Sequence, residues 1–293
     1  MIEKSTTGDK IFNIFDYTLV GLIALLCVYP MVHVLFASIS DPMLLMQHSG
    51  VLLWPRGFSL EGYKIVVQNP NIPIGYANTI FYVVAGTTIN MLLSAMGAYA
   101  LSRKKFMFKK IITIGIVFTM YFSGGLIPNF LLVRGLGLYN SRWALILPGA
   151  IATWNLIVMK TSFQNIPASL EESAKIDGAN DFTILFRIFI PVGKATMAVM
   201  ILFYAVAHWN AWFNAMVYIQ NRKLYPLQLF MREILISNST SGNIQADVDA
   251  DVFFLEEVIK YATIIISTVP ILFAYPFAQK YFVKGVMMGS LKE

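Results

Sequence analysis

Residues 15–39 read FDYTLVGLIALLCVYPMVHVLFASI, with a single acidic or basic residue, Asp16, beside the start of the run. An α-helix needs about 20 apolar residues to cross the roughly 30 Å of hydrocarbon in a bilayer. The run is too long for the core of a signal peptide, and it lacks a small-residue cleavage site after it. We therefore predict that it is an uncleaved transmembrane helix.

The composition of the whole chain points the same way. Of the 293 residues, 57% are apolar and 13% are charged, whereas a soluble domain averages about 45–50% and about 25%. These proportions exclude a disordered or disulfide-stapled chain and argue against a soluble enzyme. A single cysteine, Cys27, forms no internal disulfide, and three scattered histidines suggest no metal site. The net charge of +6 is expected to set membrane topology, so nucleic acid is not predicted as a partner.

Five further apolar runs are long enough to span a bilayer. Because the runs are long and do not alternate, a β-barrel is excluded, and the predicted fold class is an all-α integral membrane protein. No internal repeat is visible, so residues 1–293 are predicted to form a single transmembrane domain. The six predicted spans are residues 15–39, 76–101, 111–133, 142–160, 195–219 and 259–283.

The distribution of Lys and Arg orients these spans. With both termini in the cytoplasm, 14 of the 22 Lys and Arg residues lie on the inner side, while the acidic residues divide evenly between the two sides. Inner positive charge is the usual pattern of membrane proteins. The short inner loop from Arg103 to Lys110 is expected to be a solvated anchor at the lipid headgroups. The long outer loops, after the first and fifth spans, are candidates for contact with a partner or substrate.

The interiors of the six runs contain no Asp or Glu. Proton-coupled carriers usually rely on buried ionisable groups, so this composition disfavours such a mechanism, while Na⁺ held by backbone carbonyls stays open. An ATP-binding loop is also missing, because Gly193-Lys194 lacks the earlier Gly and the following Ser or Thr of a P-loop. Uphill transport would therefore draw its energy from another subunit. Ion-coupled secondary transport is the alternative.

Small and polar residues mark one face of the second run. Residues spaced by four positions lie on the same side of a helix. Such a face fits either close helix packing or the lining of a pathway. The four residues are Gly86, Asn90, Ser94 and Ala98.

Aromatic rings and amides are mixed in the fifth run. This mixture suits sugar rings, which stack on indoles and bond to amides, but it also fits an interfacial belt of aromatic residues. In a continuous helix, Trp209 and Trp212 would share one face. Asn210 and Asn214 would then share the neighbouring face. The candidate substrate-path residues are Asn90, Asn155, His208, Trp209, Asn210, Trp212 and Asn214.

The longest inner loop, residues 161–194, has the pattern of a helix, a turn and a second helix. Ser169 and Glu172 have the spacing of a capping box, directly after Pro167. A short helix on a loop needs a partner to dock against. The residues expected to face the cytosol are Leu170, Ala174 and Ile176.

The end of this helix and the start of the next are also marked. Gly178 suits a left-handed helix stop. Asn180 or Asp181 is suited to cap the second helix, which ends near Pro191.

This loop resembles the hallmark loop of the permease subunits of binding-protein-dependent ABC importers. The family motif is Glu-Ala-Ala, Gly four residues beyond, nine further residues, then Ile, any residue and Leu-Pro. Here Glu172-Ser173-Ala174 is followed at that spacing by Gly178, Ile188 and Ile190-Pro191. Ser173 and Ile190 are conservative departures. Trp209-Asn210 and the tail at 281–285 are similar to the carbohydrate-importing, maltose-type subfamily. The long last external loop and the closing segment at 284–292 resemble permeases for complex oligosaccharides, among which are acidic ones such as alginate or aldouronates.

The resemblance implies a type I ABC importer permease with six spans and a coupling helix at about 169–178, between spans four and five. It implies a second, similar permease, a dimer of ATPases that bind the ATP and Mg²⁺, and an external solute-binding protein that delivers the oligosaccharide. The chain itself would catalyse no reaction, hold no cofactor and lie in the bacterial inner membrane. The implied ATPase-coupling residues are Glu171, Glu172, Ser173, Ala174, Asp177, Gly178, Ala179 and Pro191.

Overall fold

The computed structural model describes residues 7–104, 106–241, 255–273 and 276. Within these residues the regular structure is helical and includes no β-strand, as predicted. The chain divides into two compact units, residues 1–69 with 233–268 and residues 70–232 with 269–293. All the candidate coupling and substrate-path residues belong to the second unit. The predicted outer carboxylates at 247–251 and the tail at 281–292 lie outside the described residues.

The first unit contains α1 (Thr7–Ser38), α2 (Pro42–Met46), α3 (Glu61–Gln68) and most of a helix over residues 255–273. The helix α1 is one unbroken element of 32 residues, so the first predicted span is confirmed as a single long helix. The Ser38 hydroxyl is hydrogen bonded to the Tyr63 hydroxyl at 2.7 Å, which ties the end of α1 to α3.

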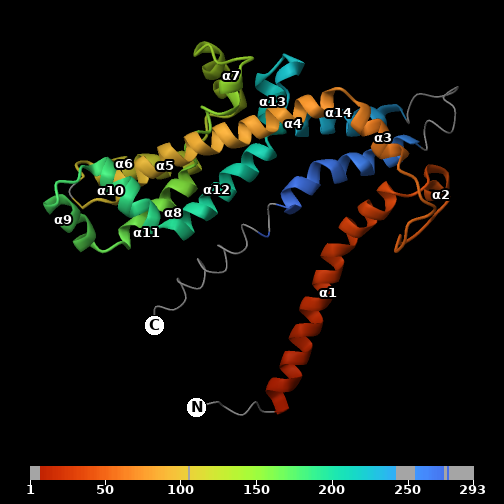
Figure 1. Ribbon diagram of the computed structural model, residues 1–293, viewed down its shortest axis with the longest axis horizontal. Helices are drawn as coiled ribbons and strands as arrows, with labels where there is room; N and C mark the ends of the chain where they lie inside the picture. The colour runs from red at the N-terminus through yellow and green to blue at the C-terminus, as the bar shows by residue number, and fades with distance from the viewer. Residues whose placement is uncertain (1–6, 105, 242–254, 274–275, 277–293) are drawn as a thin grey trace. The chain divides into compact units, whose positions relative to one another are not determined.

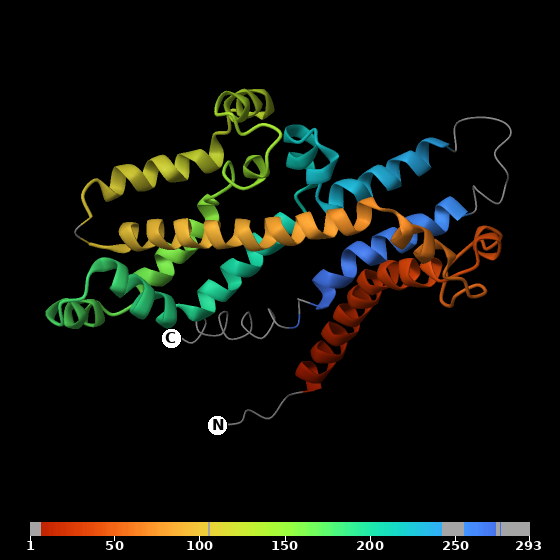
Figure 2. The ribbon, with the colours of Figure 1, turned by 45° about the horizontal axis from the view of Figure 1, so that its top comes forward.

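The second unit is organised around one long helix. It is formed by α4 (Asn71–Phe81), the π-helical turn η1 (Tyr82–Gly86) and α5 (Thr87–Ser102), which together make 32 helical residues. The helices α8 (Thr153–Gln164) and α12 (Lys194–Trp209) pack along α5 and against each other (Figure 1). The short helix α9 (Ala168–Ile176) lies beyond the end of α5 in both ribbon views (Figure 2).

Two apolar clusters hold this unit together. The first joins α5, α8, the loop helices and α12, with Met159, Phe163 and Phe189 fully buried in it. The second surrounds η1 and includes Tyr82 and Ile146. The remaining short elements of the unit are α10 (Asp181–Ile184), η3 (Leu185–Phe189), α11 (Ile190–Val192), η4 (Arg222–Leu224) and the start of α14 (Leu227–Ser241).

Three predicted spans are not continuous helices, and this part of the prediction is wrong. The run 111–133 is split into α6 (Lys109–Tyr121) and α7 (Leu126–Gly135), which meet at 118°. The helix α6 ends at Phe122, whose backbone is extended, and Gly125, with a φ of +86°, directly precedes α7.

The other two breaks have different causes. The run 142–160 contains the 3₁₀ turn η2 (Arg142–Leu145) and then α8, separated by Pro148-Gly149. Proline lacks a backbone N–H and disfavours the helical conformation of the residue before it. The run 195–219 is split into α12 and α13 (Trp212–Tyr218). Within the described part of the chain, two helices are long and apolar enough to cross a membrane, or up to four if each bent pair counts as one span.

Candidate functional site

The N-terminus of α9 is set by Pro167 and not by a capping box. Pro167 occupies the N-cap position with an extended ψ of 133° and no side-chain cap. Ser169 therefore lies inside the first turn, and the predicted pairing of Ser169 with Glu172 is wrong. The physical reason is that the fixed φ of proline starts the helix earlier than the hydroxyl would. This shift brings Glu171 into the first turn, where a carboxylate is favoured by the helix dipole.

The C-terminus of α9 is a complete Schellman motif. The Gly178 N–H donates to the carbonyl of Lys175 at 3.1 Å, and the Ala179 N–H donates to the carbonyl of Ala174 at 2.9 Å. Gly178 has a φ of +80°, which confirms the predicted left-handed stop. Ala174 and Ala179 join the same apolar cluster. Ala174 was expected to face the cytosol, but it is buried because this end of the helix is packed against the unit.

The second helix of the loop begins as predicted and then bends. Asn180 is the N-cap of α10, and its side-chain oxygen accepts a hydrogen bond from the Thr183 N–H at 2.8 Å. Helices α10, η3 and α11 lead to an 89° bend into α12. Gly193 stands at the bend, where an added Cβ would lie 3.0 Å from the Phe189 carbonyl oxygen.

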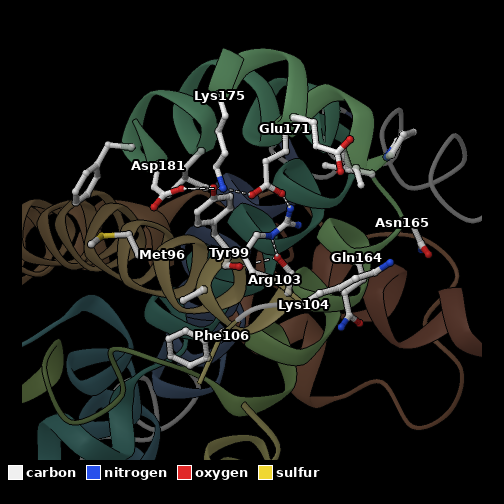
Figure 3. A pocket seen from close by; sticks show the side chains of 18 residues that line it. Met96, Tyr99, Arg103, Lys104, Phe106, Gln164, Asn165, Glu171, Lys175 and Asp181 are labelled. Atoms are coloured by element: carbon white, nitrogen blue, oxygen red, sulfur yellow. Dashed lines mark hydrogen bonds and ion pairs between the residues drawn. The ribbon is translucent and has the colours of Figure 1, made fainter. Parts of the chain in front are cut away.

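A cluster of charged groups joins α9 to the end of α5 (Figure 3). Arg103 follows α5 directly, and its guanidinium pairs with the Glu171 carboxylate. The other Glu171 oxygen accepts from Lys175 Nζ at 2.7 Å. Lys175 Nζ lies 3.9 Å from Asp181, whose carboxylate accepts from the Tyr99 hydroxyl at 3.0 Å. We call Tyr99, Arg103, Glu171, Lys175 and Asp181 the Arg103 cluster.

Arg103 is not the solvated headgroup anchor that the sequence suggested. Its side chain is 18% exposed. The guanidinium lies 4.3 Å from the Phe189 ring centroid and donates to the Phe163 carbonyl at 3.3 Å. Sequence reasoning missed this residue because a basic residue after a span is usually topological, and its partner is 68 positions away in the chain.

The charges of the cluster stabilise one another. Burial alone would raise the pKa of the Glu171 carboxyl, but hydrogen bonds and positive charge from Lys175 and Arg103 outweigh burial and hold that pKa below 4.5. The hydrogen bond to Glu171 raises the pKa of Lys175 above 10.5. Both groups are therefore ionised at neutral pH, and the cluster is a set of charge-assisted bonds.

The outer surface of the loop differs from its inner surface. A cavity of about 850 Å³ lies beside the Arg103 cluster, between the end of α5 and the loop (Figure 3). Five large apolar side chains of the loop are exposed: Leu170, Ile176, Phe182, Phe186 and Val192. Of the predicted coupling residues, five are exposed: Glu172, Ser173, Asp177, Gly178 and Pro191. Glu171, Ala174 and Ala179 instead face the unit, and Gly178 forms the turn.

The polar face of α5 contacts α12. The Asn90 amide is hydrogen bonded to the His208 imidazole, with 3.2 Å between Nδ2 and Nε2, and both residues are buried. One turn away, Ser94 Oγ lies 2.6 Å from the Tyr204 hydroxyl, which also accepts from the Ala152 N–H. Two of the predicted path residues are therefore brought together, and the residues of this face are packed between helices.

Gly86 is required for this contact. A Cβ added at Gly86 would lie 2.4 Å from His208 Nε2 and 2.5 Å from Cε1. The Asn90 amide oxygen is buried and has no hydrogen-bond partner within the described residues. Asn155 is buried as well, on α8.

The predicted faces of the fifth run are wrong, because the helix ends before they form. Asn210 is the C-cap of α12, and its amide donates to the Val206 carbonyl at 3.0 Å. Ala211 has φ −79° and ψ 53°, and the Trp212 N–H donates to the Asn210 carbonyl at 2.9 Å. These values describe an inverse γ-turn, which separates Trp209 from Trp212.

The aromatic residues beside this turn have different neighbours. The Trp209 ring lies 6.4 Å from that of Tyr76. The Arg232 guanidinium lies 4.6 Å from the ring of Trp212. Asn214 is exposed on α13. Within the described residues, no three His, Cys, Asp or Glu side chains are placed to hold a metal ion.

The sequence and the fold are similar to those of known transport proteins. The chain is 40% identical over 284 residues to the polygalacturonan/rhamnogalacturonan transport system permease protein YtcP of Bacillus subtilis, a match that covers 97% of this chain and 99% of that protein. It is 24% identical to the diacetylchitobiose uptake system permease protein NgcG of Streptomyces coelicolor, over 100% and 93% of the two chains. No protein-family model matches the sequence.

Two crystal structures have a similar fold. One is a bacterial ABC transporter involved in the import of the acidic polysaccharide alginate, with a TM-score of 0.85, 32% identity, and coverage of 95% of this chain and 99% of that one. The second is a bacterial alginate ABC transporter in complex with an alginate pentasaccharide-bound periplasmic protein. Its chain matches with a TM-score of 0.55 and 16% identity over 92% and 93% of the two chains, which supports the fold alone.

Proposed function

Because the chain belongs to the permease subunits of carbohydrate ABC importers, we propose that it forms half of an oligosaccharide pathway that separate ATPase subunits drive. The main support for this proposal comes from the loop at residues 161–194. It presents exposed apolar side chains on two short helices, Leu170 and Ile176 on α9 and Phe182 on α10. An apolar surface of this kind on a polar loop is a candidate for docking against another protein.

In this proposal α9 is the coupling helix. It sits in a groove of an ATPase subunit, with Glu172, Ser173 and Asp177 on the docking side. Gly178 and Ala179 fix the end of the helix, and Pro191 lies before the bend into α12. Closure of the ATPases moves α9, and the bundle then switches between inward and outward openings.

The partners and the location follow from the same proposal. A second, similar permease completes the pathway, and an external solute-binding protein delivers the oligosaccharide. ATP and Mg²⁺ are bound by the ATPases, and this chain catalyses no reaction. It lies in the bacterial cytoplasmic membrane as a single permease domain with six spans, counting broken helices as spans, and with both termini inside.

The substrate path lies beside the break at Asn210 and Ala211. Non-helical backbone at membrane depth is tolerated where it is buried in protein or lines a water-filled cavity. The break exposes Asn210 and Asn214, whose amides suit sugar hydroxyls, and Trp209 and Trp212 can stack on sugar rings. Asn90, Asn155 and His208 support this surface from within the bundle.

The substrate in this proposal is an acidic oligosaccharide. Residues 121–152 and 206–232, which carry the break and its neighbours, contain no Asp or Glu. Arg142 is positioned over the Phe81 ring at 4.7 Å and donates to the Asn78 side chain at 3.1 Å. Guanidinium groups held on aromatic rings suit carboxylates. The cations of these segments are Arg134, Arg142, Arg222, Lys223 and Arg232.

Reconstitution tests the function. The permease pair, its ATPases and the binding protein are placed in proteoliposomes, and uptake of galacturonate and mannuronate oligomers is compared with that of neutral oligomers of equal length. We expect ATP-dependent uptake of the acidic oligomers. Uptake by this chain without ATP or ATPases would favour the alternative, a secondary transporter.

Labelling from outside the cell tests the topology. In a Cys27→Ser background, Lys104→Cys and Lys175→Cys should be protected from an impermeant thiol reagent, while Asp249→Cys should react. Reaction at position 175 from outside would contradict the orientation of the spans.

A further inference from the structure

Arg103 connects the end of α5 to three other elements of the second unit. Its guanidinium bonds to Glu171 on α9, to the Phe163 carbonyl near the end of α8 and to the Ser102 hydroxyl, and it lies over the Phe189 ring of η3. A planar guanidinium can bond in several directions at once, which the ammonium of lysine cannot do with fixed geometry. The direct link to α9 is the pair between Arg103 and Glu171.

Apolar packing holds α9 only weakly. Of its nine residues, all of them described, Ala174 is the only one that is buried. A helix of this length is marginal in water without tertiary contacts. The Schellman motif fixes where α9 ends, but its hydrogen bonds lie within the loop. The position of α9 relative to α5 therefore depends on the Arg103 cluster.

The Arg103 cluster joins the end of α5 to both α9 and α10. Tyr99 lies in the last turn of α5 and Arg103 directly follows the helix, and they bond to Asp181 on α10 and Glu171 on α9 respectively. Lys175 bridges the two carboxylates. The pair of Arg103 with Glu171 is 18% and 15% exposed, whereas the side chain of Lys175 is 52% exposed. Solvent therefore screens the Arg103 pair least.

The helix α5 can carry a displacement to the middle of the bundle. Arg103 lies 13 residues after Asn90, so the cluster is roughly 20 Å along the helix from the contact between Asn90 and His208. No break interrupts α5 between these points. A rigid helix that is fixed at one end to α9 and packed at Asn90 against α12 is a physical connection between the two sites.

We propose that Arg103 is a positioning residue that couples α9 to α5, so that displacement of α9 by the ATPases moves the helix that carries Asn90. The inference rests on the proposed function. It assigns the coupling role to the partly buried carboxylate Glu171, as distinct from the exposed Glu172, and to the cation that directly follows α5.

The test uses the complete importer in proteoliposomes with Glu171→Gln and Arg103→Gln. We expect the ATPases to co-purify with both variants, because the outward side of α9 is unchanged. The ratio of oligosaccharide transported to ATP hydrolysed should fall about five- to ten-fold, within the usual range of coupling between sites. Lys110→Gln, which removes an exposed cation from α6, should leave the ratio unchanged.

A charge exchange separates coupling from folding. The double variant Arg103→Glu with Glu171→Arg should restore at least part of the ratio of transport to ATP hydrolysis. The single variant Arg103→Lys should have a lower ratio than the double variant, because lysine cannot hold Glu171 and the Phe163 carbonyl together. An unchanged ratio in both single variants would overturn the proposal, as would loss of ATPase binding in both. Failure of the wild-type importer to transport in an ATP-dependent way would instead refute the proposed function.

Discussion

Two polar contacts along α5, one at its end and one in its interior, are built from different chemistry. At its end, Arg103 contacts Glu171 through full charges, and both side chains are partly exposed. In its interior, Asn90 contacts His208 through an amide and an imidazole, and both residues are buried. An unpaired charge is costly away from water, whereas a neutral hydrogen bond is tolerated there. The comparison indicates that the interior contact depends on steric fit and the end contact on charge.

The largest effect is expected from a substitution that breaks the interior contact between Asn90 and His208. Gly86→Val places a branched side chain where even a Cβ would lie 2.4 Å from His208 Nε2. The ring cannot move aside cheaply, because it is buried and bound to Asn90. Overpacking of this severity costs about 3 kcal/mol, and we expect transport to be lost and the unfolding temperature in detergent to fall.

Gly115→Val is the matched control for Gly86→Val. The same side chain is added on α6, where a Cβ meets no atom of the described residues within 4 Å. Transport should be retained. Normal transport by Gly86→Val would show that α5 and α12 are not packed as described.

The next effect acts on the loop without touching its neighbours. Gly178 has a φ of +80°, and a Cβ there would meet no described atom within 4 Å. Gly178→Val therefore introduces backbone strain of about 1–2 kcal/mol and no clash. We expect transport and substrate-stimulated ATPase activity to fall together by about ten-fold, while membrane insertion survives.

Gly178→Asn sharpens this prediction. Asparagine tolerates the left-handed conformation better than valine, so this variant should keep most of the activity. Equal loss in both variants would mean that side-chain size, and not backbone conformation, matters at this position. Full stimulated activity in Gly178→Val would contradict the coupling assignment.

A smaller effect is expected beside the helix break. Asn210→Ala removes the amide that bonds to the Val206 carbonyl, and Trp209→Ala removes the ring beside Tyr76. Each should lower uptake about three- to ten-fold, roughly the value of one hydrogen bond for Asn210 and of one aromatic pair for Trp209. Sugar binding by the external protein should be unchanged, and stimulation of the ATPase should drop less than in Gly178→Val. Unchanged uptake in both variants would indicate that these residues belong to an interfacial belt or to helix packing and not to the substrate path.

The smallest effects are expected from a change of pH and from a substitution at Lys175, an exposed member of the Arg103 cluster. The pKa of Glu171 is lowered by its hydrogen bonds and by the positive charges beside it, so its contribution is present at neutral pH and is lost only as the pH falls through that lowered value. The pKa of Lys175 is raised, so its contribution is lost only as the pH rises above 10.5. The ratio of transport to ATP hydrolysis should therefore be constant from about pH 5.5 to about pH 9.

Lys175→Met tests the same cluster from its exposed side. An exposed pair with this spacing on a helix contributes about 0.3–0.5 kcal/mol, so the ratio should change by about two-fold or less. A loss as large as that of Glu171→Gln would place the main link at Lys175.

The sequence by itself determined the class of the protein and the ends of its loop. Apolar runs predict helices in a membrane because a bilayer offers the backbone no other hydrogen-bond partners. The left-handed stop at Gly178 and the cap at Asn180 were also predictable, because each depends on a few neighbouring residues. The motif around Glu172 and Pro191 was sufficient to indicate the family.

Only the tertiary structure decided which residues work together. The contact of Asn90 with His208 joins residues 118 positions apart, and that of Arg103 with Glu171 joins residues 68 positions apart. The break at Ala211 and the earlier start of α9 at Pro167 also differ from the expected pattern. Periodicity reports which residues share a face of an ideal helix, but it does not report where the helix stops or what packs against it. Those outcomes depend on the free energy of all the neighbouring segments together, which no single stretch of sequence contains.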